Sequence, residues 1–374
     1  MKKQTLFFLL LAACISLNAQ TPEHSHSHGR KIEFPDIPGY RTLKCDFHIH
    51  TVFSDGNVWP TIRVEEALKD GLDAISMTDH IEYQPHKDDI PHPDRNRSFE
   101  IAKRFAEAYD ILVIRGSEIT RSMPPGHFNA IFLEDANKLK VEDVFESFRE
   151  AKRQGAYVFW NHPNWTAQRP DGITRFDDLH LQLLKEGLFQ GIEVVNDITY
   201  SDESLQMALE NNLTIMGTSD IHGLVDWQFE VPEGGHRPIT LIMATGKTPE
   251  SIKEALLAGR TIAWFNNLLI GKEEYVKPLV MASLKIKSAT YPGKTSVARI
   301  EIENTSDADL QLRNQSPYTF HANSDVLTLK SHEVTTLEVK TLERKDSIEL
   351  PFEVLNAVVA PNLHPSIQLT VKME

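Results

Sequence analysis

The feature that most constrains the fold is a regular alternation of short apolar runs and amphipathic segments between residues 41 and 275. Each apolar run has the length of a buried β-strand, and each amphipathic segment repeats its apolar residues at helical spacing. Gly71 and Gly155 follow two of these segments, as glycines commonly follow helices. The expected strands cover residues 43–51, 72–80, 111–120, 128–133, 156–163, 191–196, 214–222, 238–245 and 260–265, and the expected helices cover residues 61–71, 98–110, 141–155, 176–187, 202–212 and 248–259.

The expected strands are nearly continuous in apolar residues, as strands of a parallel sheet covered on both faces are. Strands that alternate with helices predict parallel βα units, and seven or eight such units fit a (β/α) barrel of about 230 residues. The alternative is an open doubly wound sheet, which usually carries a glycine-rich phosphate turn after its first strand. Residues 48–56 read HIHTVFSDG at that position, which favours the barrel.

After about residue 280 the pattern changes to alternating polar and apolar residues with Asn, Asp and Ser between the runs. This period of two is typical of antiparallel strands with one buried face. We therefore expect a small antiparallel β-sandwich over residues 280–374. The segment has no cluster of Asp, His or Glu that predicts a site, so we interpret it as a structural or docking module whose partner is unknown.

Residues 1–19 have the pattern of a secretory signal peptide. Lys2 and Lys3 precede a short apolar run, and small residues near Ala19 suit cleavage there. This predicts export to the periplasm or the extracellular side. The alternative is a lipid anchor at Cys14, because LAAC at residues 11–14 resembles a lipoprotein signal. Residues 20–40 form a polar, histidine-rich leader, and no other stretch of the sequence is long and apolar enough to span a bilayer.

The formal net charge of the chain is −14. Proteins that bind nucleic acid regardless of its sequence need basic patches against phosphate, so long nucleic acid is not an expected partner. Without the signal peptide, Cys45 is the one cysteine left, which excludes an internal disulfide. We expect Cys45 to be a small buried side chain in the first strand.

Metal-binding residue types gather at the ends of the expected strands. Side chains at i and i+2 of a strand point to the same face, so His48 and His50 converge on one spot, and Asp55 follows them. In a barrel, the carboxyl ends of the strands meet at one rim. A single histidine there is commonly a core residue, but donors at so many ends together predict a metal site. The other donors are Asp79, His80, Glu118, His127, His162, Asp220 and His222.

These motifs resemble those of the PHP family, which takes its name from polymerases and histidinol phosphatases. In chain order they read HIHTVFSDG, TDH, GSEIT, GHFNA, NHP and SDIH. With its export signal and β tail, the chain looks most similar to PHP phosphodiesterases that act on small organic phosphates. The resemblance implies a distorted (β/α)7 barrel over residues 41–275 that holds two or three divalent metal ions.

The resemblance also implies which residues hold each ion, and mixed nitrogen and oxygen ligands suit manganese, zinc or iron. His127 precedes its strand, so its loop must fold inward for it to take part. The implied ligands are His48, His50, Glu118 and Asp220 for the first ion, Glu118 with His127 and His162 for the second, and Asp55, His80 and His222 for the third.

The chemistry that the resemblance implies is hydrolysis of a phosphoester by a hydroxide that bridges two of the ions. A third ion would bind a phosphate oxygen and absorb developing charge. Glu118, Asp220 and His222 are the expected catalytic residues. The expected substrate is a small phosphodiester or phosphomonoester.

Side chains on the loops of the rim are candidates for binding the organic part of the substrate. Arg121 and Arg237 can each hold a phosphate oxygen bidentately, with a surface ion pair as the alternative role. Tyr83 and His236 lie on other loops of the rim. Trp165 either lines an apolar pocket or packs against a neighbouring loop.

Three other functions stay open at this point. Metal-dependent amidohydrolases also begin with His-x-His, but they usually carry a lysine where Glu118 is expected to bridge. A nuclease for short oligonucleotides is compatible with the acidic charge. A non-catalytic metal-binding module would need no open coordination position.

Overall fold

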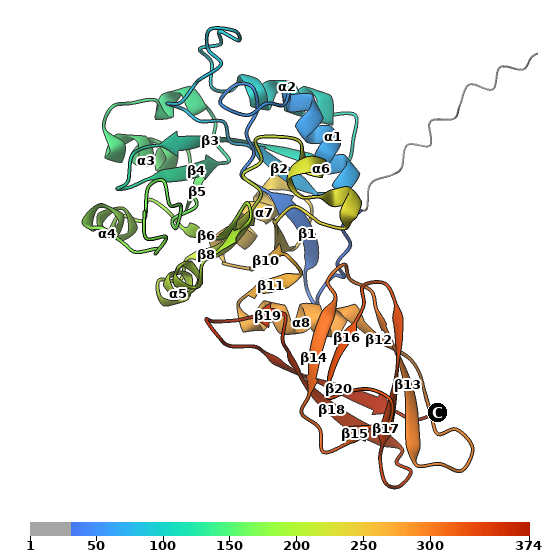
Figure 1. The fold of residues 1–374 in the computed structure, drawn as a ribbon. Coiled ribbons are helices and arrows are strands. Elements are labelled where there is room, and N and C mark those ends of the chain that lie inside the picture. The colour runs from blue at the N-terminus through green and yellow to red at the C-terminus, as the bar shows by residue number, and fades with distance from the viewer. Residues whose placement is uncertain (1–30) are drawn as a thin grey trace, which may run out of the picture.

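The computed structural model describes residues 31–374, which form an α/β part and a β part (Figure 1). The predicted signal peptide, the alternative anchor Cys14 and residues 20–30 of the predicted leader lie outside the described residues. The α/β part is a curled sheet with helices outside it, and the β part extends from one end of it. The predicted fold class, a distorted barrel followed by an antiparallel β module, is confirmed.

Seven strands form the wall that carries the predicted site. They are β1 (Arg41–Asp46), β2 (Ala74–Met77), β3 (Leu112–Thr120), β4 (His127–Ile131), β5 (Tyr157–Trp160), β6 (Gly191–Asn196) and β8 (Thr214–Thr218), paired in this order. β4 is antiparallel to β3 and β5, whereas the other neighbours are parallel. The chain reverses at β4 because residues 121–126 connect it to β3 without a helix.

Further strands continue the sheet on the other side of β1. β9 (Ile239–Ala244) pairs with β1, β10 (Thr261–Phe265) pairs with β9, and β11 (Leu268–Gly271) pairs with β10, all antiparallel. The prediction that every strand is parallel is therefore wrong for β4, β9 and β10. The parallel pairs of the wall are β1–β2, β2–β3, β5–β6 and β6–β8, and the connection between the two strands of each pair contains a helix.

The segments that follow β1 and β8 pair directly with each other and close the sheet at one rim. Ile49 and Ile221 form a parallel bridge, and the His50 amide donates to the Ile221 carbonyl at 3.1 Å. Below the bridge, Thr240 Oγ1 of β9 donates to the Gly217 carbonyl of β8 at 2.7 Å. The closed rim places the His-x-His and Asp-x-His motifs side by side.

Helices lie outside the sheet and connect most of its strands (Figure 1). Their ends follow the sequence signals: Gly71 with φ 71° ends the first helix, and Asp143 accepts from the Glu146 amide at 2.9 Å to begin the third. The helices are α1 (Pro60–Asp70), α2 (Arg97–Ala106), α3 (Val144–Arg153), α4 (Asp178–Lys185), α5 (Asp202–Glu210), α6 (Val225–Gln228), α7 (Pro249–Leu257) and α8 (Glu273–Ser283), and β7 (Thr199–Tyr200) forms a hairpin with β6.

The β part consists of two four-stranded antiparallel sheets with a shared apolar core. One sheet contains β12 (Leu284–Thr290), β13 (Val297–Asn304), β17 (Val334–Lys340) and β15 (Thr319–Phe320), and the other contains β16 (Val326–Leu329), β14 (Leu310–Asn314), β18 (Ser347–Val354) and β20 (Ser366–Lys372). Buried and exposed residues alternate along β18 and β20, as the sequence predicts.

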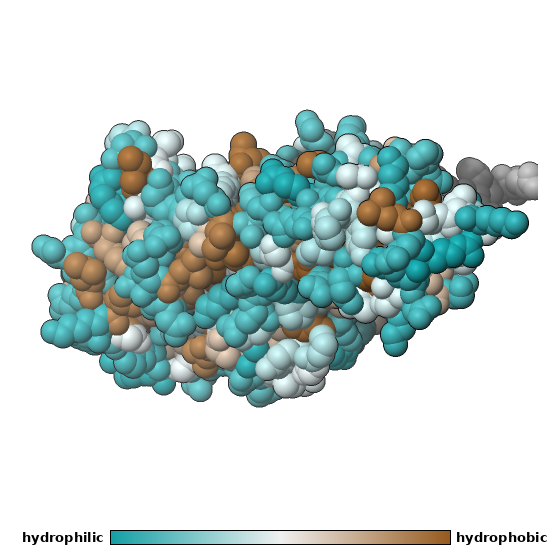
Figure 2. All heavy atoms as spheres, turned by 90° about the horizontal axis from the view of Figure 1, so that it is seen from below, coloured by the Kyte–Doolittle hydropathy of each residue, from teal (hydrophilic) through white to brown (hydrophobic). Residues whose placement is uncertain are grey.

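The two parts are joined by more than the chain connection. α8 contains the predicted domain boundary between residues 275 and 280, and β19 (Ala357–Val358) leaves the β part to pair with β11. On the face that Figure 2 shows, hydrophilic side chains dominate and apolar ones form small separate groups. Within residues 31–374, no helix has the length and apolarity needed to cross a membrane.

Arg63 of α1 is a buried arginine that holds the closed rim together. Its Nε donates to the His50 carbonyl at 2.9 Å, its Nη2 to the His222 carbonyl at 2.8 Å, and its Nη1 to the Gly223 carbonyl at 2.7 Å. Glu66, at 2.8 Å, balances its charge. One guanidinium thus binds the backbone of both segments that meet at the rim.

Arg63→Ala should destabilise the fold strongly, because it leaves buried carbonyl oxygens without donors. Hydrogen bonds from a charged donor contribute about 1.5–3 kcal/mol each, so we expect the free energy of unfolding to fall by at least about 3 kcal/mol in a denaturant titration. Arg97→Ala is the control, since Arg97 is exposed and pairs with Glu100 at the surface. It should cost less than about 0.5 kcal/mol. Equal losses in the two variants would contradict the role of Arg63.

Candidate metal centre

All of the predicted metal ligands converge at the closed rim. They are His48, His50, Asp55, His80, Glu118, His127, His162, Asp220 and His222, and they form four overlapping groups whose ligand atoms lie within 4.8 Å of one another. A cleft of about 480 Å³ opens above them. His48 and His50 are fully buried beneath the cleft, and the others line it. The structure therefore brings the whole set together, while the binding of metal by these residues stays a prediction.

The first predicted ligand set surrounds one carboxylate oxygen. Asp220 Oδ1 lies 3.1 Å from His48 Nε2 and 3.0 Å from His50 Nε2, and the two imidazole nitrogens are 3.0 Å apart. Glu118 Oε2 lies 3.5 Å from His50 Nε2. Four donors that face one another at these distances are arranged as the ligands of one ion are.

Glu118 also belongs to the second predicted set. Its Oε1 lies 3.0 Å from His127 Nδ1 and 3.5 Å from His162 Nε2. Glu118 Oε2 and His127 Nδ1 are buried, and neither makes a well-aligned hydrogen bond to another described residue. The polar atoms nearest to them belong to the same centre, since Glu118 Oε2 lies 2.6 Å from His80 Nδ1. Buried donor atoms that face one another without aligned hydrogen bonds fit a cation between them.

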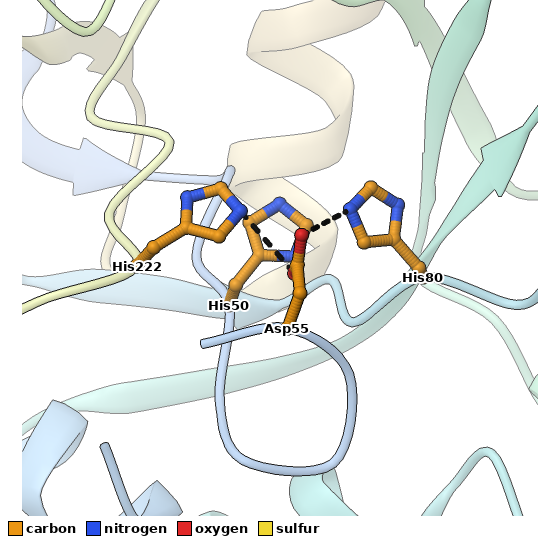
Figure 3. A group of neighbouring side chains, drawn as sticks. All are labelled: His50, Asp55, His80 and His222. Atoms are coloured by element: carbon orange, nitrogen blue, oxygen red, sulfur yellow. Dashed lines mark ion pairs between the residues drawn. The ribbon is translucent and has the colours of Figure 1, made fainter. Parts of the chain in front are cut away.

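The third predicted set is centred on Asp55, which lies between two imidazoles in Figure 3. Its Oδ1 is 3.2 Å from His222 Nε2, and its Oδ2 is 3.3 Å from His80 Nε2. The ring of His50 stacks against both histidines, and its Nδ1 is 3.6 Å from Asp55 Oδ1. Because His50 Nε2 is closer to Asp220, we keep His50 in the first set.

The side chains of the centre shift the protonation of one another. Burial raises the pKa of Glu118, but His80 and His127 outweigh it and hold that pKa well below its usual range. Burial lowers the pKa of His80, but Glu118 and Asp55 outweigh it and raise the pKa to about 10. For His50, burial and the neighbouring His222 and His80 lower the pKa to about 4. The carboxylate of Glu118 is therefore ionised, as a metal ligand must be.

The backbone around the centre is unusual at three positions. His162 has φ 28° and Asp220 has φ 49°, in the left-handed region that non-glycine residues rarely adopt. Such conformations are found preferentially at functional sites. Gly56 follows Asp55 because a Cβ there would lie 2.7 Å from the His50 carbonyl carbon and from the Thr51 amide nitrogen. Only glycine allows the loop of Asp55 to pass this close to the His-x-His segment.

Asp79 follows β2 and precedes His80, but the structure places it in a supporting position. It accepts from the Thr51 amide at 2.8 Å, from Thr51 Oγ1 at 2.8 Å and from Ser54 Oγ at 2.7 Å. These bonds fix the loop that carries Asp55. Asp79 is thus a carboxylate that positions a predicted ligand.

Glu193 is a buried residue of the centre that the sequence analysis missed. It lies in β6, 2.8 Å from His48 Nδ1, and accepts from Thr218 Oγ1 at 2.6 Å and from the His162 amide at 2.6 Å. A carboxylate on one imidazole nitrogen fixes the tautomer and orients the other nitrogen toward a metal. The sequence signal for Glu193 was its charge inside GIEVVN, a strand that is buried along its whole length.

The aromatic candidates for substrate binding lie close to the centre. Trp165 lines the cleft, and its ring centroid is 5.2 Å from that of His162. Tyr83 is half exposed, with its ring centroid 5.8 Å from that of His80, but it lies outside the cleft lining. Of these two, Trp165 is therefore placed to contact a ligand in the cleft.

The prediction that Arg237 and Arg121 bind substrate is wrong, because neither lines the cleft. Arg237 is fully buried, with Asp70 at 2.8 Å and Asp46 at 3.3 Å. Arg121 points to another loop, where it pairs with Glu82 at 3.0 Å. Ion pairs account for the positions of both, but the pairs of Arg237 are buried, whereas the alternative role was a surface ion pair.

His236 is a third candidate that the structure places elsewhere. Its ring stacks on Trp264 of β10 with centroids 3.4 Å apart. The hollow beside it is lined by residues of the β part, including Lys330 and Glu333, and it is separate from the cleft above the ligands. His236 therefore belongs to the contact between the two parts of the molecule.

Glu193→Gln should weaken metal binding, because an amide cannot hold His48 and the His162 amide as a carboxylate does. Loss of such a supporting group typically costs about 10–100-fold in metal affinity. Titration of the metal-free protein with Mn²⁺ or Zn²⁺, followed by calorimetry, measures this loss. Glu186→Gln, which changes a partly exposed carboxylate that pairs with Arg149 outside the centre, should leave the affinity unchanged. Equal affinities in wild type and Glu193→Gln would remove Glu193 from this role.

Comparison with known protein families gives two matches. A family model described as PHP domain matches residues 46–233, and a model described as Ig-like domain matches residues 284–370. The first range contains all of the converging donors, and the second covers the two antiparallel sheets except the end of β20.

Known proteins resemble this chain to very different extents. A two-domain protein of Bacteroides vulgatus ATCC 8482, described as containing a "predicted PHP-like metal-dependent phosphoesterase", is 43% identical with a TM-score of 0.85, and the match covers 92% of this chain and 99% of that chain. PsfC of Pseudomonas syringae PB-5123 is 17% identical with a TM-score of 0.42, over 65% of this chain and 96% of that chain. An uncharacterised protein of Methanocaldococcus jannaschii is 39% identical over 85 residues, which are 22% of this chain and 36% of that protein's length.

Proposed function

Because the chain belongs to the PHP family, we propose that it is an exported metal-dependent phosphoesterase that hydrolyses small phosphodiesters or phosphomonoesters. The observation that carries the proposal is the convergence of imidazole and carboxylate donors on the floor of one cleft. The buried atoms of Glu118 and His127, which make no well-aligned hydrogen bond to another described residue, support cations at that floor.

The geometry supports three ligand sets for two or three ions. Glu118 is the shared member of the first two sets, because its Oε2 faces His50 and its Oε1 faces His127. Nitrogen and oxygen donors together suit manganese, zinc or iron. The proposed sets are His48, His50, Glu118 and Asp220, then Glu118, His127 and His162, then Asp55, His80 and His222.

When bound, divalent ions at such a site activate water and neutralise the charge of a phosphoryl group. The residues of the chain position and orient the ligands. Glu193 turns His48 toward Asp220, and Asn161 Nδ2 donates to Glu118 Oε1 at 2.9 Å. His222 Nδ1 lies 2.7 Å from the Asp220 carbonyl, which leaves Nε2 to face the cleft. We propose Glu118, Asp220 and His222 as the catalytic residues, since they line the cleft where substrate would bind.

The cleft favours this function over the alternatives. The bridging position between the first two sets is held by Glu118 and not by the lysine that is usual in amidohydrolases. Among the described residues that line the cleft there is no lysine or arginine, so a long anionic polymer would lack the contacts it needs. The cleft opens onto the ligands, whereas a purely structural metal site is closed.

The proposed export and domain limits rest on the sequence. The signal peptide over residues 1–19, with cleavage near Ala19, or the alternative anchor at Cys14, would place the enzyme outside the cytoplasm. The proposed catalytic domain covers residues 41–275, and the β module covers residues 280–374. The mass of the mature protein distinguishes cleavage near Ala19 from a lipid-modified Cys14.

Removal of divalent ions should abolish the activity. We expect EDTA to stop hydrolysis of bis(p-nitrophenyl) phosphate or p-nitrophenyl phosphate, and Mn²⁺ or Zn²⁺ to restore it, because the ions supply the water activation. Elemental analysis of the active protein should find two or three ions per chain. Stoichiometric metal without hydrolysis of either ester would indicate a metal-binding module.

Asp220→Ala should remove activity while the fold persists. Asp220 lies 3.0 Å from His50 Nε2, so its loss opens the first ligand set and should lower kcat/KM by at least about 100-fold. Asp325→Ala, an exposed residue of the β part, is the control. Normal activity in Asp220→Ala, or loss in both variants, would contradict the assignment.

A further inference from the structure

We propose that the cleft selects phosphoesters that carry one phosphoryl group and an uncharged organic group rich in hydroxyls, such as a sugar or a polyol. This inference rests on the proposed phosphoesterase activity and concerns the outer wall of the cleft. The wall consists of Asn164, Trp165, Thr166, Asp197, Thr199 and Gln228.

The wall offers no cation to a second phosphate. Within the described part of the chain, neither lysine nor arginine lines the cleft, and Arg121 and Arg237 are held in ion pairs elsewhere. Protein sites for phosphate commonly use the charge and the donors of these two residue types. Among the described residues of the cleft, the proposed metal ligands at its floor, once they hold ions, are therefore the place where a phosphoryl group can be neutralised.

Asp197 adds a carboxylate to the wall of the cleft. It lies in the turn between β6 and β7, lines the cleft, and accepts from Gln228 Nε2 at 2.7 Å. A carboxylate at this position repels a second phosphate but accepts hydrogen bonds from hydroxyl groups.

The other residues of the wall can contact the hydroxyl groups of a ligand and the face of its ring. The side chains of Asn164 and Thr166 line the cleft, and neither makes a side-chain hydrogen bond to another described residue. Trp165, which is 45% exposed, packs against His162 and turns part of its indole to the cleft. Amides, hydroxyls and a carboxylate around one aromatic ring provide polar groups that fix a ligand's orientation and an apolar surface for its carbon skeleton.

The test compares esters with the same carbon skeleton in the metal-loaded full-length protein. Glycerol 3-phosphate is paired with n-propyl phosphate, and bis(glyceryl) phosphate with di-n-propyl phosphate, so the leaving alcohols differ mainly in their hydroxyls. We expect kcat/KM to favour the glyceryl member by about tenfold, as one or two new hydrogen bonds would give. Glucose 1,6-bisphosphate should be a poorer substrate than glucose 1-phosphate. Equal use of propyl and glyceryl esters, or a preference for phosphocholine or for the bisphosphate, would overturn the proposal.

Two variants assign the selectivity to the wall. Asp197→Ala should remove most of the glyceryl preference, and Asp197→Asn should raise the rate on glucose 1,6-bisphosphate relative to glucose 1-phosphate. Asp171→Asn removes the same charge from an exposed position on the neighbouring loop and is the control, which should keep the wild-type ratios. Ratios that shift equally in Asp171→Asn and Asp197→Asn would contradict a specific role for Asp197.

Failure of this inference is distinguishable from failure of the proposed function. If the metal-loaded protein hydrolyses no mono- or diester, including the p-nitrophenyl esters, the proposed function fails. If it hydrolyses p-nitrophenyl and propyl esters as well as glyceryl esters, the phosphoesterase proposal holds and the selectivity proposal alone is overturned.

Discussion

The pairing of the segments after β1 and β8 is the constraint on which the candidate site depends. These two segments are more than 160 residues apart in the chain, yet the Ile49–Ile221 bridge and the bonds from Arg63 hold them side by side. The bridge sets His48 and His50 against Asp220, while Asp55 and His222 approach from the loops on either side. A sheet left open at this point would separate the donors of the first and third sets.

Beneath the ligands lies a layer of buried polar residues that fixes their orientation. Glu193 engages His48, Asp79 fixes the loop of Asp55, and Asp46 accepts from Ser219 Oγ at 2.5 Å next to the Asp-x-His motif. Arg237 neutralises Asp46 from below. Buried charges of this kind persist where each is paired or hydrogen-bonded. These hydrogen bonds and ion pairs therefore preorganise the rim.

The convergence of the predicted donors could be foreseen from the sequence because their place near strand ends follows from local pattern. The directions of β4, β9 and β10 could not be predicted. The direction of a strand depends on whether its connection crosses the sheet, and an apolar run of residues does not reveal the path of the connection. Arg237 was wrongly predicted to bind substrate because Asp46 and Asp70, the carboxylates with which it pairs, are distant from it in the chain. Glu193 could have been found, since a lone carboxylate in a buried strand needs a partner.

Because β19 pairs with β11, the C-terminal region contributes directly to the sheet of the α/β part. It covers a sheet edge that would otherwise present unpaired backbone groups, and exposed edges invite association with other chains. The apolar cluster also runs without interruption from Trp264 and Leu269 through α8 into the Ig-like sheets. The C-terminal region is thus a structural part of the α/β fold. A chain shortened to end after α8 should therefore aggregate before its activity could be measured.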